Sequence, residues 1–363
     1  MGRIRNLLKN VLHDGRCIEE EYHEYCPRCQ ADLTMQNGFH NDISYWRCKG
    51  CDELLLQPDL EHSAIWFCDQ CQSVLNEQEG FWEKCGEWKC LNCGFTNKIN
   101  STTLFASEDE YLRELQNPYR GLSNEQILKL SELEEVEYIE NRKNIILVKD
   151  ARGTKYIKKI LTEYDSSIYQ YLLRHPINHM PQILQMYQGK NALIVVEEYI
   201  PGRTIYDILC ETVIEPLQAA KIAVDLSKIL RKLHQLPQPI IHRDVKPSNV
   251  MINSKGEVFL LDMNVAKWFD EMKKEDTKLF GTPGYAAPEQ LGYGFFASSE
   301  KTDVFAVGTL LNYMITGSFP KEKKAEGTIW NIIHNCICLD QEKRYCDQEL
   351  IHVLTDYIND VIS

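Results

Sequence analysis

The stretch His242-Arg-Asp-Val-Lys-Pro-Ser-Asn249 determines how most of this 363-residue chain is interpreted. Further short motifs accompany it in a fixed order. They are Tyr156-Ile-Lys158 upstream, and Leu261-Asp-Met-Asn264, Ala287-Pro-Glu289, Asp303-Val-Phe-Ala-Val-Gly308 and Lys343-Arg-Tyr345 downstream. An isolated Lys or Asp is usually a solvated surface charge. An ordered set of this kind instead indicates a functional domain over residues 134–363.

The central octapeptide resembles the catalytic loop of protein kinases, because it matches H-R-D-x-x-x-x-N at every specified position. The upstream motif is similar to the family's V-A-I-K strand, and the downstream motifs are similar to D-F-G, A-P-E, the following core helix and the late arginine motif. Lys246 resembles the lysine of the serine/threonine-directed members. The resemblance implies a bilobal kinase fold, with an N-lobe at 134–198 and a C-lobe at 202–363.

The hydrophobic pattern of this region agrees with that fold. Ile145–Lys149 and Lys155–Ile160 form a strand–turn–strand signal, and Ala192–Val196 is a further strand. The later pattern is mainly helical, at Leu217–His234 and Asp347–Ile362. Strands followed by helices predict an α+β arrangement.

The resemblance assigns roles in the transfer of the γ-phosphate of ATP to a serine or threonine hydroxyl of a protein substrate. Asp244 would accept or orient the hydroxyl proton. Lys246 would neutralise the transferring phosphate. Asn249 and Asp262 would bind Mg²⁺, because a hard cation prefers oxygen ligands.

Other residues would hold the nucleotide. Lys158 would bind the α- and β-phosphates of ATP. Strand alternation would then send Lys159 to the opposite, solvated face of the sheet. A hinge around Glu198 to Ile200 would bind adenine through its backbone groups.

The resemblance also implies structural interactions around the catalytic loop. Glu289 and Arg344 would form a buried ion pair without a catalytic role. Asp303 would brace the backbone of the loop, and Thr282 would lie where kinases bind the catalytic aspartate and lysine.

Two departures from the family pattern concern the smaller lobe. The place of the glycine-rich loop is taken by Ile139–Leu147, which contains no glycine. Ser167 stands where the helix αC glutamate of the family belongs. Glu163, one helical turn earlier, is the candidate partner for the nucleotide-binding lysine, and Asp165 is the alternative.

A third departure follows the catalytic loop. D-F-G is replaced by Asp262-Met-Asn264, in which methionine can fill the apolar position of phenylalanine. The segment after it contains Thr277, which we expect to be a regulatory autophosphorylation site. A phosphate there could pair with Arg243 beside the catalytic aspartate.

Most of the cysteines lie in the first quarter of the chain. The sequence has 14 cysteines, and Cys17 and Cys85 are two of the ten that precede residue 94. The other eight form two copies of one pattern at an offset of 42 residues. They are Cys26, Cys29, Cys48 and Cys51, followed by Cys68, Cys71, Cys90 and Cys93.

This spacing is typical of zinc ribbons with four cysteine ligands, in which two C-x-x-C turns place their thiolates around one ion. We therefore predict ribbons at 26–51 and 68–93, each holding one structural Zn²⁺. Disulfides and a redox-active dithiol pair are the alternatives. Residues 1–25 form an N-terminal segment, and residues 94–133 form a helical connector.

Charge and hydrophobicity limit the kinds of molecule that the chain is expected to bind. The net charge is −13 and the pI about 5.3, and the second ribbon has five acidic and two basic residues. Contact with nucleic acid is therefore not expected, and the ribbons are expected to contact protein or to have a purely structural role. There is no secretion signal or membrane-length apolar run, so we expect a cytoplasmic location, where thiols bind metals more often than they form disulfides.

Two functions remain open. The leading one is an active serine/threonine protein kinase with a zinc-ribbon docking or regulatory module. The alternative is a pseudokinase scaffold that only binds partners. The presence of all four motif residues, Lys158, Asp244, Asn249 and Asp262, favours activity, and the glycine-poor loop argues against it.

Overall fold

The computed structural model divides the chain into two compact units, Met1–Asn117 and Pro118–Ser363. The predicted connector at 94–133 is thus shared between the units. The structure describes residues 25–26, 28–37, 39, 45–51, 54–56, 65–81, 85–99, 104–105, 108–139, 144–270, 281–292 and 297–363. Within them, no helix has the length and apolar character needed to cross a lipid bilayer.

The first unit contains the repeated cysteine pattern, and its backbone repeats with the same 42-residue offset. β1 (Tyr45–Arg47) pairs antiparallel with β2 (Leu54–Leu56), as β4 (Glu87–Lys89) pairs with β5 (Thr96–Lys98). The isolated bridge between Tyr25 and Asp32 has its counterpart between Phe67 and Val74. The duplication seen in the sequence is therefore a duplication of structure.

An aromatic cluster completes the second ribbon. β3 (Ile65–Trp66) pairs with β6 (Leu104–Phe105), which leads into α2 (Glu108–Gln116). Tyr111 on α2 stacks on Phe67 with 3.9 Å between ring centroids and meets Phe105 edge-on. These rings bury apolar surface that so short a unit cannot bury otherwise.

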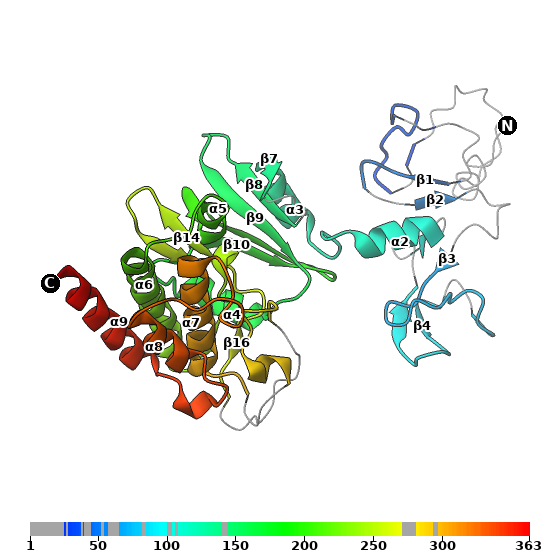
Figure 1. Cartoon of the computed structure of the whole chain (residues 1–363). Coiled ribbons are helices and arrows are strands. Elements are labelled where there is room, and N and C mark those ends of the chain that lie inside the picture. Colours follow the sequence, from blue (N-terminus) through cyan, green and yellow to red (C-terminus); the bar gives the residue numbers. More distant parts are fainter. Residues whose placement is uncertain are drawn as a thin grey trace, which may run out of the picture. The chain divides into compact units, whose positions relative to one another are not determined.

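The second unit begins with α3 (Asn124–Ser131), whose capping box is formed by Ser123 and Gln126. An antiparallel sheet in the order β10-β11-β9-β8-β7 follows (Figure 1). Its members are β7 (Glu134–Tyr138), β8 (Ile145–Lys149), β9 (Lys155–Leu161), β10 (Ile183–Gln188) and β11 (Leu193–Glu198).

The two faces of this sheet have different neighbours. Leu122 and Leu130 from the α3 region cover one face, where they pack on Ala192, Ile194 and Val196 of the β11 strand region. The opposite face belongs to the main core of the unit and lies toward α4 (Ser166–Arg174). One strand therefore presents alternate residues to two different environments.

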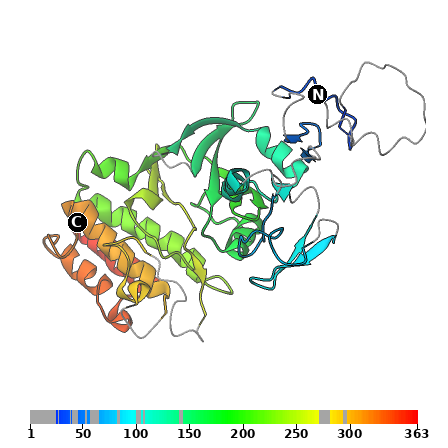
Figure 2. The ribbon, with the colours of Figure 1, turned by 90° about the vertical axis from the view of Figure 1, so that its right-hand side faces the viewer.

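The remainder is mainly helical. α6 (Pro216–His234), α7 (Glu300–Thr316) and α9 (Asp347–Ile362) lie side by side (Figure 2). α7 is apolar on nearly all sides because it is the buried central helix. The smaller elements are β12 (Gly202–Thr204), α5 (Ile205–Leu209), β13 (Ile240–Ile241), η3 (Pro247–Asn249), β14 (Val250–Asn253), β15 (Val258–Leu260), β16 (Lys267–Trp268), η4 (Pro288–Leu291), α8 (Ile329–Cys336) and η5 (Gln341–Lys343). The predicted α+β, bilobal arrangement is confirmed.

Candidate active site and metal centres

The loop between β13 and β14 gathers the polar groups of the predicted catalytic site around Asp244. One carboxylate oxygen of Asp244 accepts a 2.6 Å hydrogen bond from the Thr282 hydroxyl. The other lies 2.7 Å from the Lys246 ammonium and accepts a 2.9 Å bond from the Asn249 amide. Lys246 also reaches the Thr282 hydroxyl at 3.0 Å, so the structure brings these four residues together.

Asp303 of α7 fixes the backbone of this loop through hydrogen bonds. Its two carboxylate oxygens accept the backbone N–H groups of His242 and Arg243, each at 2.8 Å. The bracing role predicted for Asp303 is therefore present. Arg243 has a left-handed φ of 69°. Such a conformation is unfavourable for arginine and persists where surrounding interactions enforce it.

A buried histidine adds a further support. His234 lies between two carboxylates, with Nε2 2.8 Å from Asp303 and Nδ1 2.7 Å from Asp347. Burial disfavours the charged imidazole, but the two carboxylates outweigh this effect and raise the pKa of His234 to about 10. The catalytic loop is thus anchored through Asp303 to α6 and α9.

A cavity lies beside this loop, between the sheet and the helical lobe. Its lining includes the hinge residues Glu198 and Ile200, together with Asn249 and Asp262. Asp262 has a φ of 66°. The Asn249 amide makes its two hydrogen bonds to Asp244 through its nitrogen, so its oxygen is the atom that could bind a metal ion. The carboxylate and amide oxygens fit the preference of Mg²⁺.

The prediction that Lys158 faces this cavity is wrong. Lys158 pairs across the sheet with Val196, on the face covered by the α3 region, where its ammonium meets Glu135 and the Tyr119 hydroxyl. Lys159 lines the cavity instead. It is 4% exposed and therefore not solvated as predicted. Adjacent residues of a strand point to opposite faces of the sheet, so only one of the two lysines can face the cavity. The prediction assigned that role to Lys158 instead of Lys159.

The candidates for the acidic partner of this lysine are also placed elsewhere. Glu163 is exposed and precedes α4. Asp165 caps α4 by accepting the backbone N–H of Ser167 at 2.9 Å. Lys159 forms an ion pair with Glu197 of β11, at 2.7 Å. Sequence reasoning missed Glu197; its signal is the first of two glutamates that follow four apolar residues in one strand.

Two further predicted features fall partly or wholly outside the described residues. The glycine-poor loop is described only at its ends, because residues 140–143 lie outside. Thr277 lies within 271–280, which is also outside, so its regulatory role stays a prediction. Met263 is buried in the main core, as expected for the apolar position.

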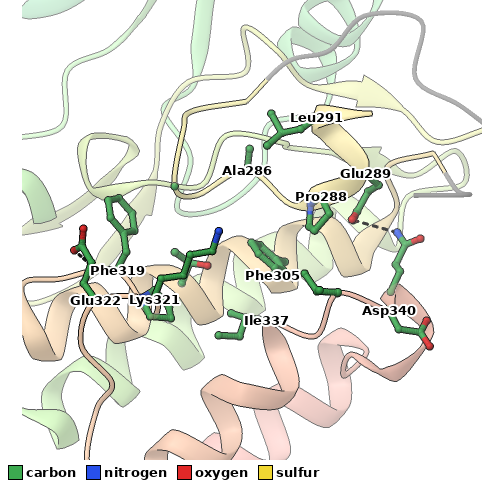
Figure 3. Close-up of a pocket in the computed structure, with 15 residues that line it drawn as sticks. Ala286, Pro288, Glu289, Leu291, Phe305, Phe319, Lys321, Glu322, Ile337 and Asp340 are labelled. Carbon is green, nitrogen blue, oxygen red and sulfur yellow. Dashed lines mark hydrogen bonds between the residues drawn. The ribbon is translucent and has the colours of Figure 1, made fainter. Parts of the chain in front are cut away.

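The predicted structural ion pair between Glu289 and Arg344 is present in the helical lobe. Arg344 binds Glu289 through two hydrogen bonds of 2.7 and 2.9 Å, and both side chains are buried. Glu289 also helps to line a large apolar groove beside Phe305 and Phe319 (Figure 3). This groove contains none of the catalytic-loop residues, so its size does not make it the site of chemistry.

The eight predicted zinc ligands form two groups of four sulfur atoms. Within each group all ligand atoms lie within 4.8 Å of one another. Cys26 and Cys51 have sulfurs 3.5 Å apart, and Cys71 and Cys90 have sulfurs 3.7 Å apart. A tetrahedral zinc with Zn–S bonds of about 2.3 Å separates its sulfurs by about 3.8 Å. The sets therefore fit a zinc ion.

A glutamine supports the third cysteine of each set, again at the 42-residue offset. Gln36 donates to the Cys48 sulfur at 3.4 Å and accepts the Lys49 backbone N–H at 2.9 Å. Gln78 does the same for the Cys90 sulfur at 3.4 Å and the Leu91 N–H at 2.8 Å. Sequence reasoning missed both glutamines, although comparison of the two repeats would have found them.

These contacts stabilise thiolates, the form that binds metals. Burial opposes ionisation of Cys90, but hydrogen bonds from Ser73, Gln78 and backbone amides lower its pKa to about 5. The equivalent effect, with Gln36 and the Gly50 amide, lowers the pKa of Cys48 to about 6. Hydrogen-bonded outer partners of this kind orient metal ligands.

Comparison with known proteins agrees with this geometry. The sequence profile of the family described as "Protein kinase domain" matches residues 131–361, which is more than half of the chain. The match covers the sheet, the cavity and the catalytic loop, and it ends in α9.

Individual relatives match smaller stretches. The chain is 33% identical over 190 residues to calmodulin-binding receptor-like cytoplasmic kinase 1 of Arabidopsis thaliana, covering 50% of this chain and 39% of that protein. It is 37% identical over 138 residues to a probable serine/threonine-protein kinase of Corynebacterium efficiens, covering 37% and 20%. Mouse citron Rho-interacting kinase is 24% identical over 266 residues, covering 64% and 13%. The chain thus aligns with less than half of the length of each.

Proposed function

Because the chain belongs to the protein kinase family, we propose that it transfers the γ-phosphate of ATP to serine or threonine hydroxyls of a protein substrate. The observation that carries this proposal is the hydrogen-bonded set of Asp244, Lys246, Thr282 and Asn249. Phosphoryl transfer demands little covalent chemistry from a protein. It depends on positioning and on charge neutralisation, which such a set can supply.

Each residue then has a role set by its place. Asp244 accepts or orients the proton of the substrate hydroxyl, and Thr282 and Asn249 fix the direction of its carboxylate. Lys246 neutralises the phosphate as it transfers. Asn249 and Asp262 would hold Mg²⁺, which supplies further charge neutralisation at the phosphates.

The nucleotide would occupy the cavity between the lobes. Its adenine would meet the backbone at Glu198 and Ile200, both in the lining. Lys159, rather than Lys158, would bind the α- and β-phosphates, because Lys159 shares that lining with Asp262.

The test of this proposal is phosphate transfer from Mg·ATP to the protein itself or to a generic protein substrate. Asp244→Asn should lower the rate by about 10²–10⁴-fold, the usual contribution of a positioned acid–base group. Asp225→Asn is the matched control, because Asp225 is exposed on α6 and pairs only locally with Lys228 in the described part of the chain. Nucleotide binding without any transfer by the unaltered protein would favour the pseudokinase scaffold.

We further propose that the first unit holds two structural Zn²⁺ ions, and that its ribbons contact protein rather than nucleic acid. The sulfur distances and the outer glutamines support the metal assignment. The acidic charge of the second ribbon supports the protein partner. Use of eight thiolates as ligands favours a reducing compartment such as the cytoplasm.

Metal analysis of the purified chain should therefore find two zinc ions. Replacing Cys68 and Cys71 together by serine should leave one, because the two ribbons have separate ligand sets. Cys85→Ser is the control and should retain both ions, since Cys85 belongs to neither set. Fewer than two ions in the unaltered chain would contradict the proposed duplication of zinc sites.

A further inference from the structure

The ion pair between Lys159 and Glu197 lies inside the wall of the nucleotide cavity. The ammonium and a carboxylate oxygen are 2.7 Å apart, and the two side chains are 6% and 9% exposed. Both residues line the cavity, as does Asp262. A buried pair of this kind is held in place, because separating the two charges costs free energy in a poorly solvated site.

The sheet register explains why these two residues meet. Lys159 on β9 lies opposite Val195 on β11, and Glu197 lies opposite Ile157. Lys159 and Glu197 are thus diagonal neighbours on one face of adjacent strands, within reach of long side chains. The hydrogen bonds of the sheet fix their separation.

α4 is linked to the cavity in a different way. Its sequence, SSIYQYLLR, contains no acidic residue. Tyr169 of α4 donates a 2.8 Å hydrogen bond to the Asn264 side chain, next to Asp262. Ser167 accepts a 2.7 Å bond from the Trp268 indole. Both links are neutral, and both join α4 to the segment that follows the catalytic loop.

We propose that Glu197 is the positioning residue for Lys159 and replaces the carboxylate that α4 lacks. This inference rests on the proposed function, since Lys159 must bind nucleotide phosphates for its position to matter. Because both partners belong to one sheet, Lys159 keeps its place whatever the position of α4. Movement of α4 would then act on Asn264 and Trp268, and not on the phosphate-binding lysine.

The test compares Glu197→Gln with Glu163→Gln, measured as steady-state phosphate transfer and as binding of Mg·ATP. E197Q should lower kcat/KM by about 10–100-fold with a raised KM for ATP, because a lysine misplaced by about 1 Å no longer meets the phosphates. E163Q should stay within about twofold, since Glu163 is exposed and outside the cavity. An unchanged kcat/KM together with unchanged binding of Mg·ATP in E197Q would overturn the proposal.

A double-variant cycle gives the second readout. In a Lys159→Met background, E197Q should cost nothing further, because a positioning residue acts only through the group that it positions. Additive losses would refute the proposal. Glu197→Asp, which keeps the carboxylate, should bind Mg·ATP more tightly than E197Q and serves if E197Q fails to fold. If the unaltered protein transfers no phosphate, the proposed function fails, while the ATP-binding comparison still tests the pair.

Discussion

Replacing Lys159 by methionine should lower kcat/KM for phosphate transfer by at least about 10²-fold, whereas the same replacement of Lys158 should change it by less than about threefold. Lys159 lines the cavity with Asp262 and pairs with Glu197. Removing it takes away a charge that acts on the phosphates in a water-poor site. Lys158 points to the other face, toward Glu135 and Tyr119.

The two variants are matched in chemistry and adjacent in sequence, so each is the control for the other. Lys158→Met breaks a contact of a buried ammonium and can lower the unfolding midpoint. Rates should therefore be measured well below that midpoint and normalised to folded protein by circular dichroism. A large loss in Lys158→Met with an active Lys159→Met would contradict the strand faces seen in the structure.

Replacing Arg344 by methionine should lower the free energy of unfolding by about 3–5 kcal/mol, because it leaves the buried Glu289 carboxylate without its positively charged partner. The guanidinium makes two hydrogen bonds to that carboxylate, at 2.7 and 2.9 Å, and one of 2.8 Å to the Cys338 carbonyl. Urea unfolding followed by the helical circular dichroism signal measures the change.

The matched control is Arg152→Met. Arg152 also pairs with a carboxylate, Asp150 at 3.3 Å, but its side chain is 84% exposed. Pairs of this kind contribute little, so the unfolding free energy should change by no more than about 0.5 kcal/mol. Equal effects of the two replacements would show that the buried pair contributes no more to the free energy of unfolding than the exposed pair does.

Short motifs with a fixed backbone context could be predicted from the sequence. The catalytic-loop residues, the Glu289–Arg344 pair and both cysteine sets occupy the places expected for them. For the catalytic loop and the cysteine sets, spacing along the chain fixes spacing in space, through a tight loop or a C-x-x-C turn.

Features that depend on the sheet register could not be predicted in this way. Lys158 and Lys159 differ by one residue, and a shift of one residue exchanges the faces of a strand. Nothing local to the motif shows which lysine meets the cavity. Glu197 lies 38 residues further along the chain and meets Lys159 only because β9 and β11 are neighbours.

The cover that the α3 region provides has a practical consequence for the boundary of a catalytic fragment. Leu122, Leu130 and Tyr119 shield the outer apolar face of the sheet. A fragment that starts at residue 134 would leave Ile194 and Val196 on a bare surface prone to association. Recombinant work on phosphate transfer without the ribbons should start at Pro118, where the compact unit itself begins.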